Sequence, residues 1–387
     1  GLVRPNGVRN VAAAKARMVE VMGGEERCRR TEPSKTYPQG QVQVDADACN
    51  ATEDPILEAY AELGSFKTVK SKDIPALMLG RYLPIHSNFD TLLATGRTSS
   101  SRPNIQNIRR LPGIRECFIP RPGTVFADAD YDGLELRTLA QVCIKILGKS
   151  KLGEALNNGL DPHLMVAATI LGLDYEDAKC RRKEGDETVD NARQAGKVAN
   201  FGYPGGLGAK TFVEYARKGY GVKLTVDEAK DLKQQWLHAW PEMEDYLWLA
   251  GKSCENPDGT ASVTHLFSNR VRGECYFTVA CNSLFQGLGA DATKAAGYLI
   301  AKACYLERDS VLFGCRIVNY IHDQFLLEVP EETGHECAME LARLMIEGAK
   351  PFLPDVPPTV KEPLLARCWS KKAKQVWEDG RLVPWCE

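Results

Sequence analysis

The sequence predicts an α+β fold in which a helical segment interrupts a lobe that contains strands. Three observations support this. Thr124–Asp130 has the apolar run of a buried strand that ends in carboxylates, and Ile317–Val329 has the pattern of strand, tight turn and strand. Between them, residues 161–250 are dominated by helical periodicity. The order helices, strand, helices, hairpin is typical of an α+β lobe with a helical insertion.

The remaining elements follow in chain order. Val8–Met22 and Pro55–Gly64 are predicted to be helices, and Thr95–Ile108 is predicted to be a polar loop. A further helix is expected over Leu134–Leu147, directly after the first strand. The last is an amphipathic helix over Gly334–Lys350, whose apolar face carries Cys337, Leu341, Leu344, Met345 and Gly348.

Composition sets limits on the class of protein. The 387 residues are 44% apolar, enough for two or three lobes with a large core. No apolar run reaches the roughly 18 residues that a membrane span needs. The 13 cysteines form no Cys-x-x-Cys pair, which favours reduced thiols in the cytoplasm over disulfides or a zinc site. With a net charge of −2, any contact with nucleic acid must come from local basic patches.

Two acidic sites lie beside predicted strands. Asp128, Asp130 and Asp132 follow the first strand, and Asp323 lies between the two strands of the hairpin. Carboxylates there are costly unless they are solvated, paired or bound to metal. If the two sites converge, their oxygens suit hard cations such as Mg²⁺, which act in pairs in displacement at phosphorus. Any one of these acids could instead simply end a strand at a turn.

One predicted helix carries a cationic face. Arg193, Lys197 and Phe201 recur every four residues and therefore share one side of the helix. Two cations and an aromatic ring suit the phosphates and the nucleoside of a triphosphate, although a solvated basic face with a core phenylalanine explains the pattern too. Gly205–Thr211 imitates a phosphate-binding P-loop but fails its spacing, because Ala209 separates the glycine from the lysine.

Taken together, these segments resemble family A DNA polymerases, the bacterial polymerase I and phage replicative group. The family's first catalytic motif, Asp-Tyr-Ser-Gln-Ile-Glu-Leu-Arg, reads Asp130–Arg137 here. The second, Arg-x-x-x-Lys-x-x-Asn-Phe-Gly, reads Arg193–Gly202, and the third, His-Asp-Glu, reads His322–Gln324. Weaker matches, in the right order, are Thr95–Ser100, Pro103–Ile108, Asp161–His163 and Gln286–Asp291.

The resemblance implies a role for each matching position. Two Mg²⁺ ions would be held by Asp130, Asp323 and the Tyr131 carbonyl, with Asp130, Asp323 and Lys197 as the catalytic residues. The residues implied to bind the nucleotide are His163, Arg193, Lys197, Phe201 and Glu135, the last as a steric gate against a ribose 2′-hydroxyl. The residues implied to contact DNA are Arg97, Asn104, Asn107, Arg270, Gln286 and His322.

The resemblance also implies a right-hand architecture of palm, fingers and thumb, with an antiparallel palm sheet and mostly helical fingers and thumb. Residues 1–94 would form a reduced thumb and lead-in, and residues 95–160 the first part of the palm. The fingers would occupy 161–254, and 255–387 would complete the palm with a C-terminal helix and a tail.

Several positions depart from the family pattern. Gln324 replaces the usual glutamate of the third motif, which removes a negative charge beside the metals. Gly205 stands where the family usually has a tyrosine that stacks at the template position, and Pro204 should disturb the helix before it. Ser268 and Asn269 replace an expected Gly-Arg pair. The Asp174–Glu176 segment is better explained as a capped helix start than as a proofreading exonuclease motif.

These features predict a template-directed DNA polymerase that extends a primer with dNTPs by two-metal-ion phosphoryl transfer and releases pyrophosphate. Two alternatives remain open: a single-subunit RNA polymerase-like enzyme, which Glu135 argues against, and an inactive DNA-binding module. The expected partners are primer–template DNA and dNTPs, with an upstream exonuclease domain or replication factors as candidates. We expect a cytoplasmic monomer without exonuclease activity in this chain, and the divergent second motif favours a phage or viral type.

Overall fold

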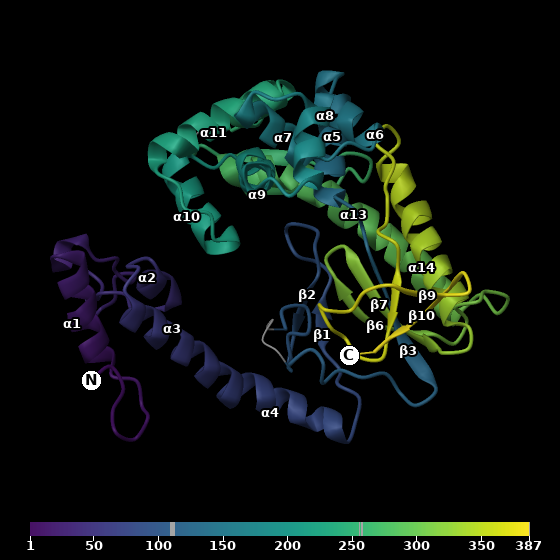
Figure 1. Cartoon of the computed structure of the whole chain (residues 1–387), viewed down its shortest axis with the longest axis horizontal. Helices are drawn as coiled ribbons and strands as arrows, with labels where there is room; N and C mark the ends of the chain where they lie inside the picture. The colour runs from purple at the N-terminus through teal and green to yellow at the C-terminus, as the bar shows by residue number, and fades with distance from the viewer. Residues whose placement is uncertain (109–112, 255, 257, 387) are drawn as a thin grey trace. The chain divides into compact units, whose positions relative to one another are not determined.

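The computed structural model describes residues 1–108, 113–254, 256 and 258–386. The chain forms two compact units (Figure 1). The first consists of Gly1–Asn88 with Ser101–Pro103, and the second of Phe89–Ser100 with Asn104–Glu387. Of the residues described, none belongs to a helix that is both long and apolar enough to cross a bilayer.

The first unit is helical. Its elements are α1 (Val11–Met22), η1 (Glu25–Arg27), α2 (Ala46–Asn50), α3 (Pro55–Thr68), η2 (Val69–Asp73), α4 (Ile74–Leu77) and η3 (Met78–Arg81). Helix α1 begins three residues after the predicted start, because the Asn10 side chain caps it by accepting a hydrogen bond from the Ala13 amide at 3.3 Å. Asp54 caps α3 and also pairs with Arg17 at 2.6 Å, which joins α1 to α3.

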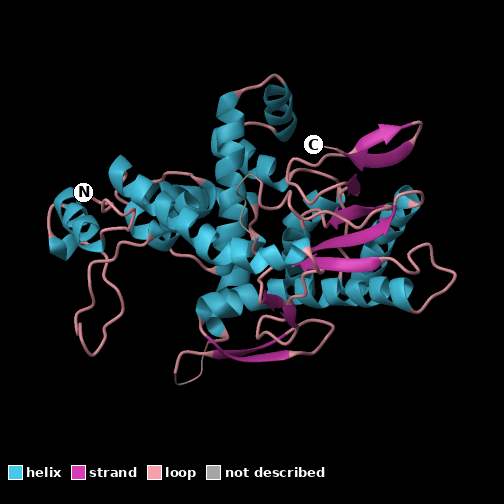
Figure 2. Cartoon of the chain, turned by 90° about the horizontal axis from the view of Figure 1, so that it is seen from below, coloured by secondary structure: helices cyan, strands magenta, loops and turns pink. Residues whose placement is uncertain are grey.

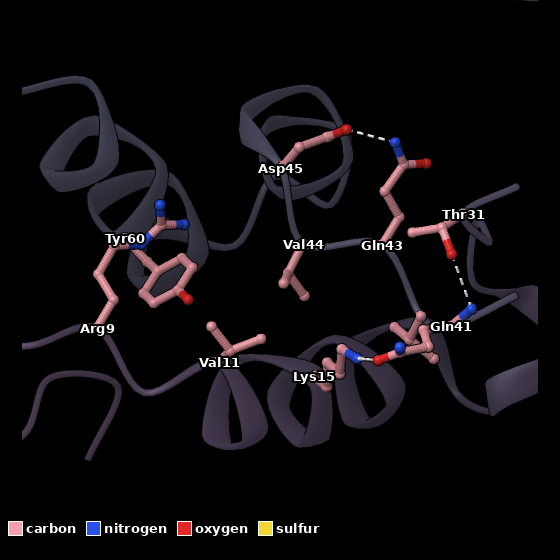
Figure 3. A pocket seen from close by; sticks show the side chains of 10 residues that line it. Arg9, Val11, Lys15, Thr31, Gln41, Gln43, Val44, Asp45 and Tyr60 are labelled. Atoms are coloured by element: carbon pink, nitrogen blue, oxygen red, sulfur yellow. Dashed lines mark hydrogen bonds between the residues drawn. The ribbon is translucent and has the colours of Figure 1, made fainter. Parts of the chain in front are cut away.

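A pocket in the first unit is lined by both polar and apolar side chains (Figure 3). The Arg9 guanidinium lies 3.9 Å from the centre of the Tyr60 ring, a cation–π contact. Lys15 donates a hydrogen bond to Gln41 across the same pocket. The pocket contains none of the predicted site residues.

The second unit is built on a six-stranded sheet with the strand order β6-β7-β3-β8-β10-β9. Its strands are β3 (Thr124–Asp130), β6 (Arg316–Ile321), β7 (Gln324–Pro330), β8 (Leu364–Ala366), β9 (Val376–Glu378) and β10 (Arg381–Trp385). All neighbours are antiparallel except β8 and β10, which are parallel. The prediction of an antiparallel sheet therefore holds for four of the five strand pairs and misses the parallel pairing of β8 with β10.

One face of this sheet is covered by two helices, α13 (Phe277–Tyr305) and α14 (Gly334–Ala349) (Figures 1 and 2). Alternate residues of β3 point into this core, and Val125, Ala127 and Ala129 are almost completely buried. Helices α13 and α14 approach closely at Gly348, where a Cβ would lie 2.4 Å from the Ala296 Cα. The β3 residues that alternate with Val125, Ala127 and Ala129, including Asp128 and Asp130, therefore face the other side of the sheet.

The other helices of the second unit form a separate apolar core with part of α13. They are α5 (Leu134–Leu147), α6 (Lys151–Asn157), α7 (Pro162–Leu171), α8 (Tyr175–Lys183), α9 (Glu187–Gly202), η4 (Tyr203–Gly205), α10 (Ala209–Tyr220), α11 (Val226–Ala239) and α12 (Glu242–Lys252). The predicted helical insertion is thus confirmed. Pro204 ends α9, as predicted, since the chain continues as a 3₁₀ turn.

The last elements are two small sheets and a short turn. Strands β1 (Asn88–Asp90) and β2 (Ser99–Ser101) pair, as do β4 (Ala261–Thr264) and β5 (Val271–Cys275), and η5 (Lys350–Phe352) follows α14. Sequence analysis predicted none of these strands. No strand was predicted after residue 350 either, where β8, β9 and β10 extend the central sheet.

Candidate active site

Asp130 and Asp323 lie at adjacent strand ends in the second unit. Asp130 is the last residue of β3 and pairs in register with Gln324, the first residue of β7. The Tyr131 amide donates a hydrogen bond to the Asp323 carbonyl at 3.3 Å, which joins the two strand ends. Tyr131 itself is held by its hydroxyl, which donates to the Met345 carbonyl of α14 at 2.5 Å. The predicted convergence of these two acids is therefore present in the structure.

Two polar side chains touch the β3 carboxylates. Gln324 Nε2 lies 2.7 and 2.8 Å from the two carboxylate oxygens of Asp128. Lys361 Nζ lies 2.5 Å from Asp130 Oδ2 and partly balances the charge of the acidic cluster. Burial opposes the charge of this lysine, but its hydrogen bond to Asp130 and the surrounding acids outweigh that effect, so the pKa of Lys361 is raised.

Two carboxyl groups of the site, those of Asp323 and Asp128, have raised pKa values. Burial raises the pKa of Asp323 from its usual 3.8 to about 6, and the charge of nearby Asp130 acts in the same direction. The pKa of Asp128 is likewise raised to about 6 by burial, against the effect of the Gln324 hydrogen bond. Crowded, desolvated carboxylates of this kind gain stability when a cation binds, and they are common at functional sites.

Asp323→Asn should stabilise the metal-free protein at neutral pH. Because folding raises the pKa of Asp323, the folded state binds this proton more tightly, and stability is lost as pH rises from about 4 to about 6. The variant lacks this loss. We therefore expect equal free energies of unfolding near pH 4, and a variant more stable than the wild type by roughly 1–3 kcal/mol at pH 7.5. Urea unfolding of metal-free protein measures this, and a variant that is less stable at pH 7.5 would contradict it.

Glu135 lies in the first turn of α5 and is contacted by two residues predicted to bind DNA. Gln286 Nε2 donates to Glu135 Oε1 at 3.1 Å, and Arg97 Nη2 lies 3.8 Å from Glu135 Oε2. The glutamate side chain stays about one-third exposed. Segments far apart in the sequence thus bring Arg97, Glu135 and Gln286 together within one unit.

The cationic face of α9 is present, and α9 packs against α7. Arg193 Nε donates to Asp161 Oδ2 at 2.7 Å, so part of its charge is neutralised. Lys197 forms no ion pair with any residue in the described part of the chain. The Phe201 ring is half-buried and lies 5.5 Å from the His163 ring, centre to centre. A Cβ on Gly196 would lie 2.6 Å from the His163 carbonyl, so glycine there permits the close packing of the two helices.

A buried hydrogen-bond chain sets the protonation of His163. The indole N–H groups of Trp236 and Trp240 donate to Asn200 Oδ1 at 3.0 and 2.9 Å, which makes the other amide atom, Nδ2, a donor. Asn200 Nδ2 lies 3.0 Å from His163 Nδ1, so that ring nitrogen must accept. Burial, with the charges of Arg193 and Lys197, lowers the pKa of His163 to about 4 despite the opposing charge of Asp161. His163 is therefore neutral near pH 7, with its proton on Nε2.

Gly205 lies close to the Asn282 side chain, which would have to move to admit a side chain at position 205. A Cβ there would be 2.8 Å from Asn282 Nδ2, and that amide nitrogen donates to the Gly205 carbonyl at 3.5 Å. Asn282 Oδ1 accepts from Gln286 Nε2 at 3.2 Å. The break after α9 is thereby connected through Asn282 and Gln286 to Glu135.

The remaining predicted DNA contacts occupy different settings. Arg270 donates to Asp291 and to the carbonyls of Ala94, Thr95 and Gly287, so its guanidinium joins the loop before β2 to α13. The Asn104 side chain accepts from the Asn107 amide at 3.0 Å and shapes its own turn, while Asn107 is exposed. His322 has a φ of 59° at the tip of the β6–β7 turn, beside Asp323.

Three residues that contact the site were not predicted from the sequence. Lys361 lies between α14 and β8 and carries no sequence signal of a role. Asn282 lies one helical turn before Gln286, a spacing that could have indicated it. Asp128 was noticed in the acidic run but was not assigned to the site, although alternation along β3 places it on the same face as Asp130.

Comparison with known proteins identifies the family. The sequence profile described as DNA polymerase family A matches residues 16–369, which is most of the chain. The chain belongs to DNA polymerase family A.

Among related family A polymerases, the DNA polymerase I of Aquifex aeolicus (strain VF5) is 30% identical over 342 residues, covering 86% of this chain and 54% of the relative. The thermostable DNA polymerase I of Thermus filiformis is 32% identical over 324 residues, covering 78% and 35%. The chain thus spans about half or less of the length of these relatives. A solved structure, the POL domain of Pol1 from M. smegmatis in complex with DNA primer-template and dNTP, has a TM-score of 0.67 at 24% identity, covering 93% of this chain and 64% of that one.

The fold of the chain, which is similar to that of the M. smegmatis POL domain, confirms the predicted α+β architecture. In the described residues no three His, Cys, Asp or Glu side chains form a group that could hold a metal by themselves. Asp130 and Asp323 supply two carboxylates at adjacent strand ends. That donor set fits Mg²⁺, which usually takes one or two carboxylates and completes its shell with water and substrate phosphates.

Proposed function

We propose that this chain is the polymerase region of a template-directed DNA polymerase. It would extend a primer with dNTPs and release pyrophosphate. The observation that carries the proposal is the meeting of Asp130 and Asp323 at adjacent strand ends, in the same unit as the Arg193, Lys197 and Phe201 face of α9. Family membership supports it, because the match to DNA polymerase family A at residues 16–369 includes all of these residues.

Each of these residues would have a distinct role in the reaction. Asp130 and Asp323 would hold two Mg²⁺ ions, with the Tyr131 carbonyl as a further ligand. Bound there, the ions would lower the barrier to attack of the primer 3′-oxygen and stabilise the leaving pyrophosphate. Lys197, Arg193 and the Nε2–H of neutral His163 would face the triphosphate and balance its charge. Phe201 would pack on the sugar and base, and Glu135 would exclude a ribose 2′-hydroxyl.

DNA binding is assigned to residues near Glu135 and the β6–β7 turn. Arg97 and Gln286 would contact the minor-groove edge of the primer terminus, where the shared acceptors allow contacts without sequence preference. His322 would lie beside the terminal primer nucleotide. Asn104, Asn107 and Arg270 are weaker candidates, and the bonds that Arg270 makes to Asp291 and three carbonyls favour a supporting role for it.

The lobes are proposed as in the family. Residues 1–94 would form a reduced thumb and lead-in, 95–160 and 255–387 the palm, and 161–254 the fingers. Primer–template DNA and dNTPs are the proposed partners, supported by the M. smegmatis POL domain, which is described in complex with both. An upstream exonuclease domain and replication factors remain proposed partners.

Primer extension with single nucleotides tests this function. A labelled primer on a defined template should be extended by the complementary dNTP with Mg²⁺, and the matched rNTP should be used at least about 100-fold less efficiently because Glu135 blocks the 2′-hydroxyl. Efficient use of rNTPs would favour the RNA polymerase-like alternative. If the wild type shifts the primer in a gel but never extends it, the inactive DNA-binding alternative is correct.

Phe201→Tyr should relax discrimination against dideoxynucleotides. A phenyl ring cannot replace the hydrogen bond that is lost with the 3′-hydroxyl, whereas a tyrosine hydroxyl can. We expect the preference for dNTP over ddNTP to fall by roughly 10- to 100-fold in Phe201→Tyr. Phe201→Leu is the control, since it removes the ring without adding a hydroxyl. Competition of ddNTP against dNTP measures the ratio, and equal ratios in the wild type and Phe201→Tyr would refute the assignment.

A further inference from the structure

Asp128 and Gln324 form a close pair beside the two predicted metal-binding acids. Asp128 lies two residues before Asp130 on β3, so both side chains are on the sheet face opposite α13 and α14. Gln324 pairs in register with Asp130 across β3 and β7. Its Nε2 lies 2.7 and 2.8 Å from the two oxygens of Asp128. The amide therefore bridges from the end of β7 back along β3.

This contact fixes the orientation of the glutamine amide. A carboxylate only accepts hydrogen bonds, so the atom that faces Asp128 must be the nitrogen. The planar amide then directs its carbonyl oxygen away from Asp128. A charge-assisted hydrogen bond of this kind is stronger than one between neutral groups, and it holds the side chain in one rotamer.

The pair also explains why glutamate is absent at position 324. A glutamate there would place two carboxylates within hydrogen-bond distance of each other, beside two further acids. Like charges that close repel strongly where water is scarce. The neutral residue at position 324 is thus matched to the acid at position 128. The total charge at this end of β3 and β7 is the same as it would be with a glutamate at 324 and a neutral residue at 128.

We propose that Asp128 is a positioning residue that has taken over the negative charge of the third motif, and that it sets the Gln324 amide beside the metal-binding acids. Asp128 acts through Gln324 and through its field, and is not itself a metal ligand. The proposal rests on the proposed polymerase function, and it replaces the expectation that Gln324 leaves the site short of one charge. The proposal therefore predicts that a glutamate at position 324 is tolerated only when position 128 carries a neutral residue.

A charge-swap cycle tests the exchange. Gln324→Glu, Asp128→Asn and the double variant Asp128→Asn/Gln324→Glu are compared with the wild type at pH 8. Primer extension is measured against Mg²⁺ concentration, and urea unfolding is measured without metal. A matched control pair joins α5 to the segment between η5 and β8, where Gln141 Nε2 donates to Asp355 Oδ2 at 2.7 Å. It receives the same exchange, Asp355→Asn with Gln141→Glu.

We expect Gln324→Glu to raise the Mg²⁺ midpoint or lower the extension rate by roughly 10-fold, and Asp128→Asn by roughly 3- to 10-fold. The double variant should return to within about 3-fold of the wild type, since it restores one acid and one amide. The control exchange should leave the Mg²⁺ midpoint unchanged. A double variant no better than the worse single variant would overturn the proposal, as would single variants that change unfolding alone.

The two measurements, primer extension and urea unfolding, separate this inference from the proposed function. If the wild type does not extend a primer, the polymerase function fails, but unfolding without metal still tests the pair. If the changes in the free energy of unfolding are non-additive in the swap cycle, they support the matched Asp128–Gln324 contact. Additive changes overturn it. If the wild type extends a primer and the swap cycle is additive in both arms, the inference alone fails.

Discussion

Primer extension by the Asp323→Asn variant should be at least about 1,000-fold slower than by the wild type, with DNA binding retained. The substitution keeps the size of the side chain but removes the charge that would hold a divalent ion. Asp323 lies directly before β7, beside the end of β3, so no nearby acid can take over the same position without moving a strand end. Single-turnover extension of a labelled primer measures the rate, and a gel shift measures binding of the DNA.

The adjacent acid Asp132 provides the control for this variant. Asp132 is exposed and belongs to the same acidic run, and its backbone amide is fixed to the Thr359 carbonyl at 2.8 Å. Asp132→Asn changes the net charge equally, and we expect it to extend primers within about 3-fold of the wild type. Equal losses in both variants would show that general charge, rather than metal binding at Asp323, controls the reaction.

Lys197→Ala should reduce kcat/KM for the incoming dNTP by roughly 100- to 1,000-fold. Lys197 is the cation of α9 that forms no ion pair with another described residue, whereas Arg193 is already paired with Asp161. The full charge of the lysine is therefore available to a triphosphate. Arg193→Ala should show a smaller loss, and single-nucleotide incorporation over a range of dNTP concentrations separates kcat from KM.

Lys179 on α8 is the matched control for Lys197. It is exposed and pairs with Glu176 at 3.1 Å, one helical turn away. Lys179→Ala should leave kcat/KM for dNTP within about 2-fold of the wild type, because exposed pairs of this kind contribute little. A larger loss in Arg193→Ala than in Lys197→Ala would contradict the charge argument.

The sequence predicted those parts of the fold whose cause is local. β3, α5 and α14 were predicted to within one residue, because an apolar run or a 3.6-residue period marks each of them. The strands β8, β9 and β10 were missed because they are only three to five residues long, and β8 is placed by its pairing with β3, a distant part of the chain. Such pairing leaves no periodic pattern within a short segment.

In the candidate site, too, residues with a local sequence signal were predicted, and residues placed by distant parts of the chain were not. Asp130 and Asp323 could be predicted because each directly borders an apolar strand and lies in a family motif. The approach of Lys361 to Asp130 depends on where a loop before β8 passes, which no local pattern encodes. The Asp128–Gln324 contact needed the register of β3 against β7, since a slip of one residue would turn Asp128 to the other face.

The most direct test of the account is a crystal structure of the chain with primer–template DNA, a non-reactive dNTP and Mn²⁺ in place of Mg²⁺. Anomalous diffraction would locate the ions independently of the protein density. The account predicts Mn²⁺ in contact with the Asp130 and Asp323 carboxylates, at about 2.1–2.2 Å, between the primer 3′ end and the triphosphate. Ions bound elsewhere, with both carboxylates free of metal while the DNA and nucleotide are in place, would contradict it.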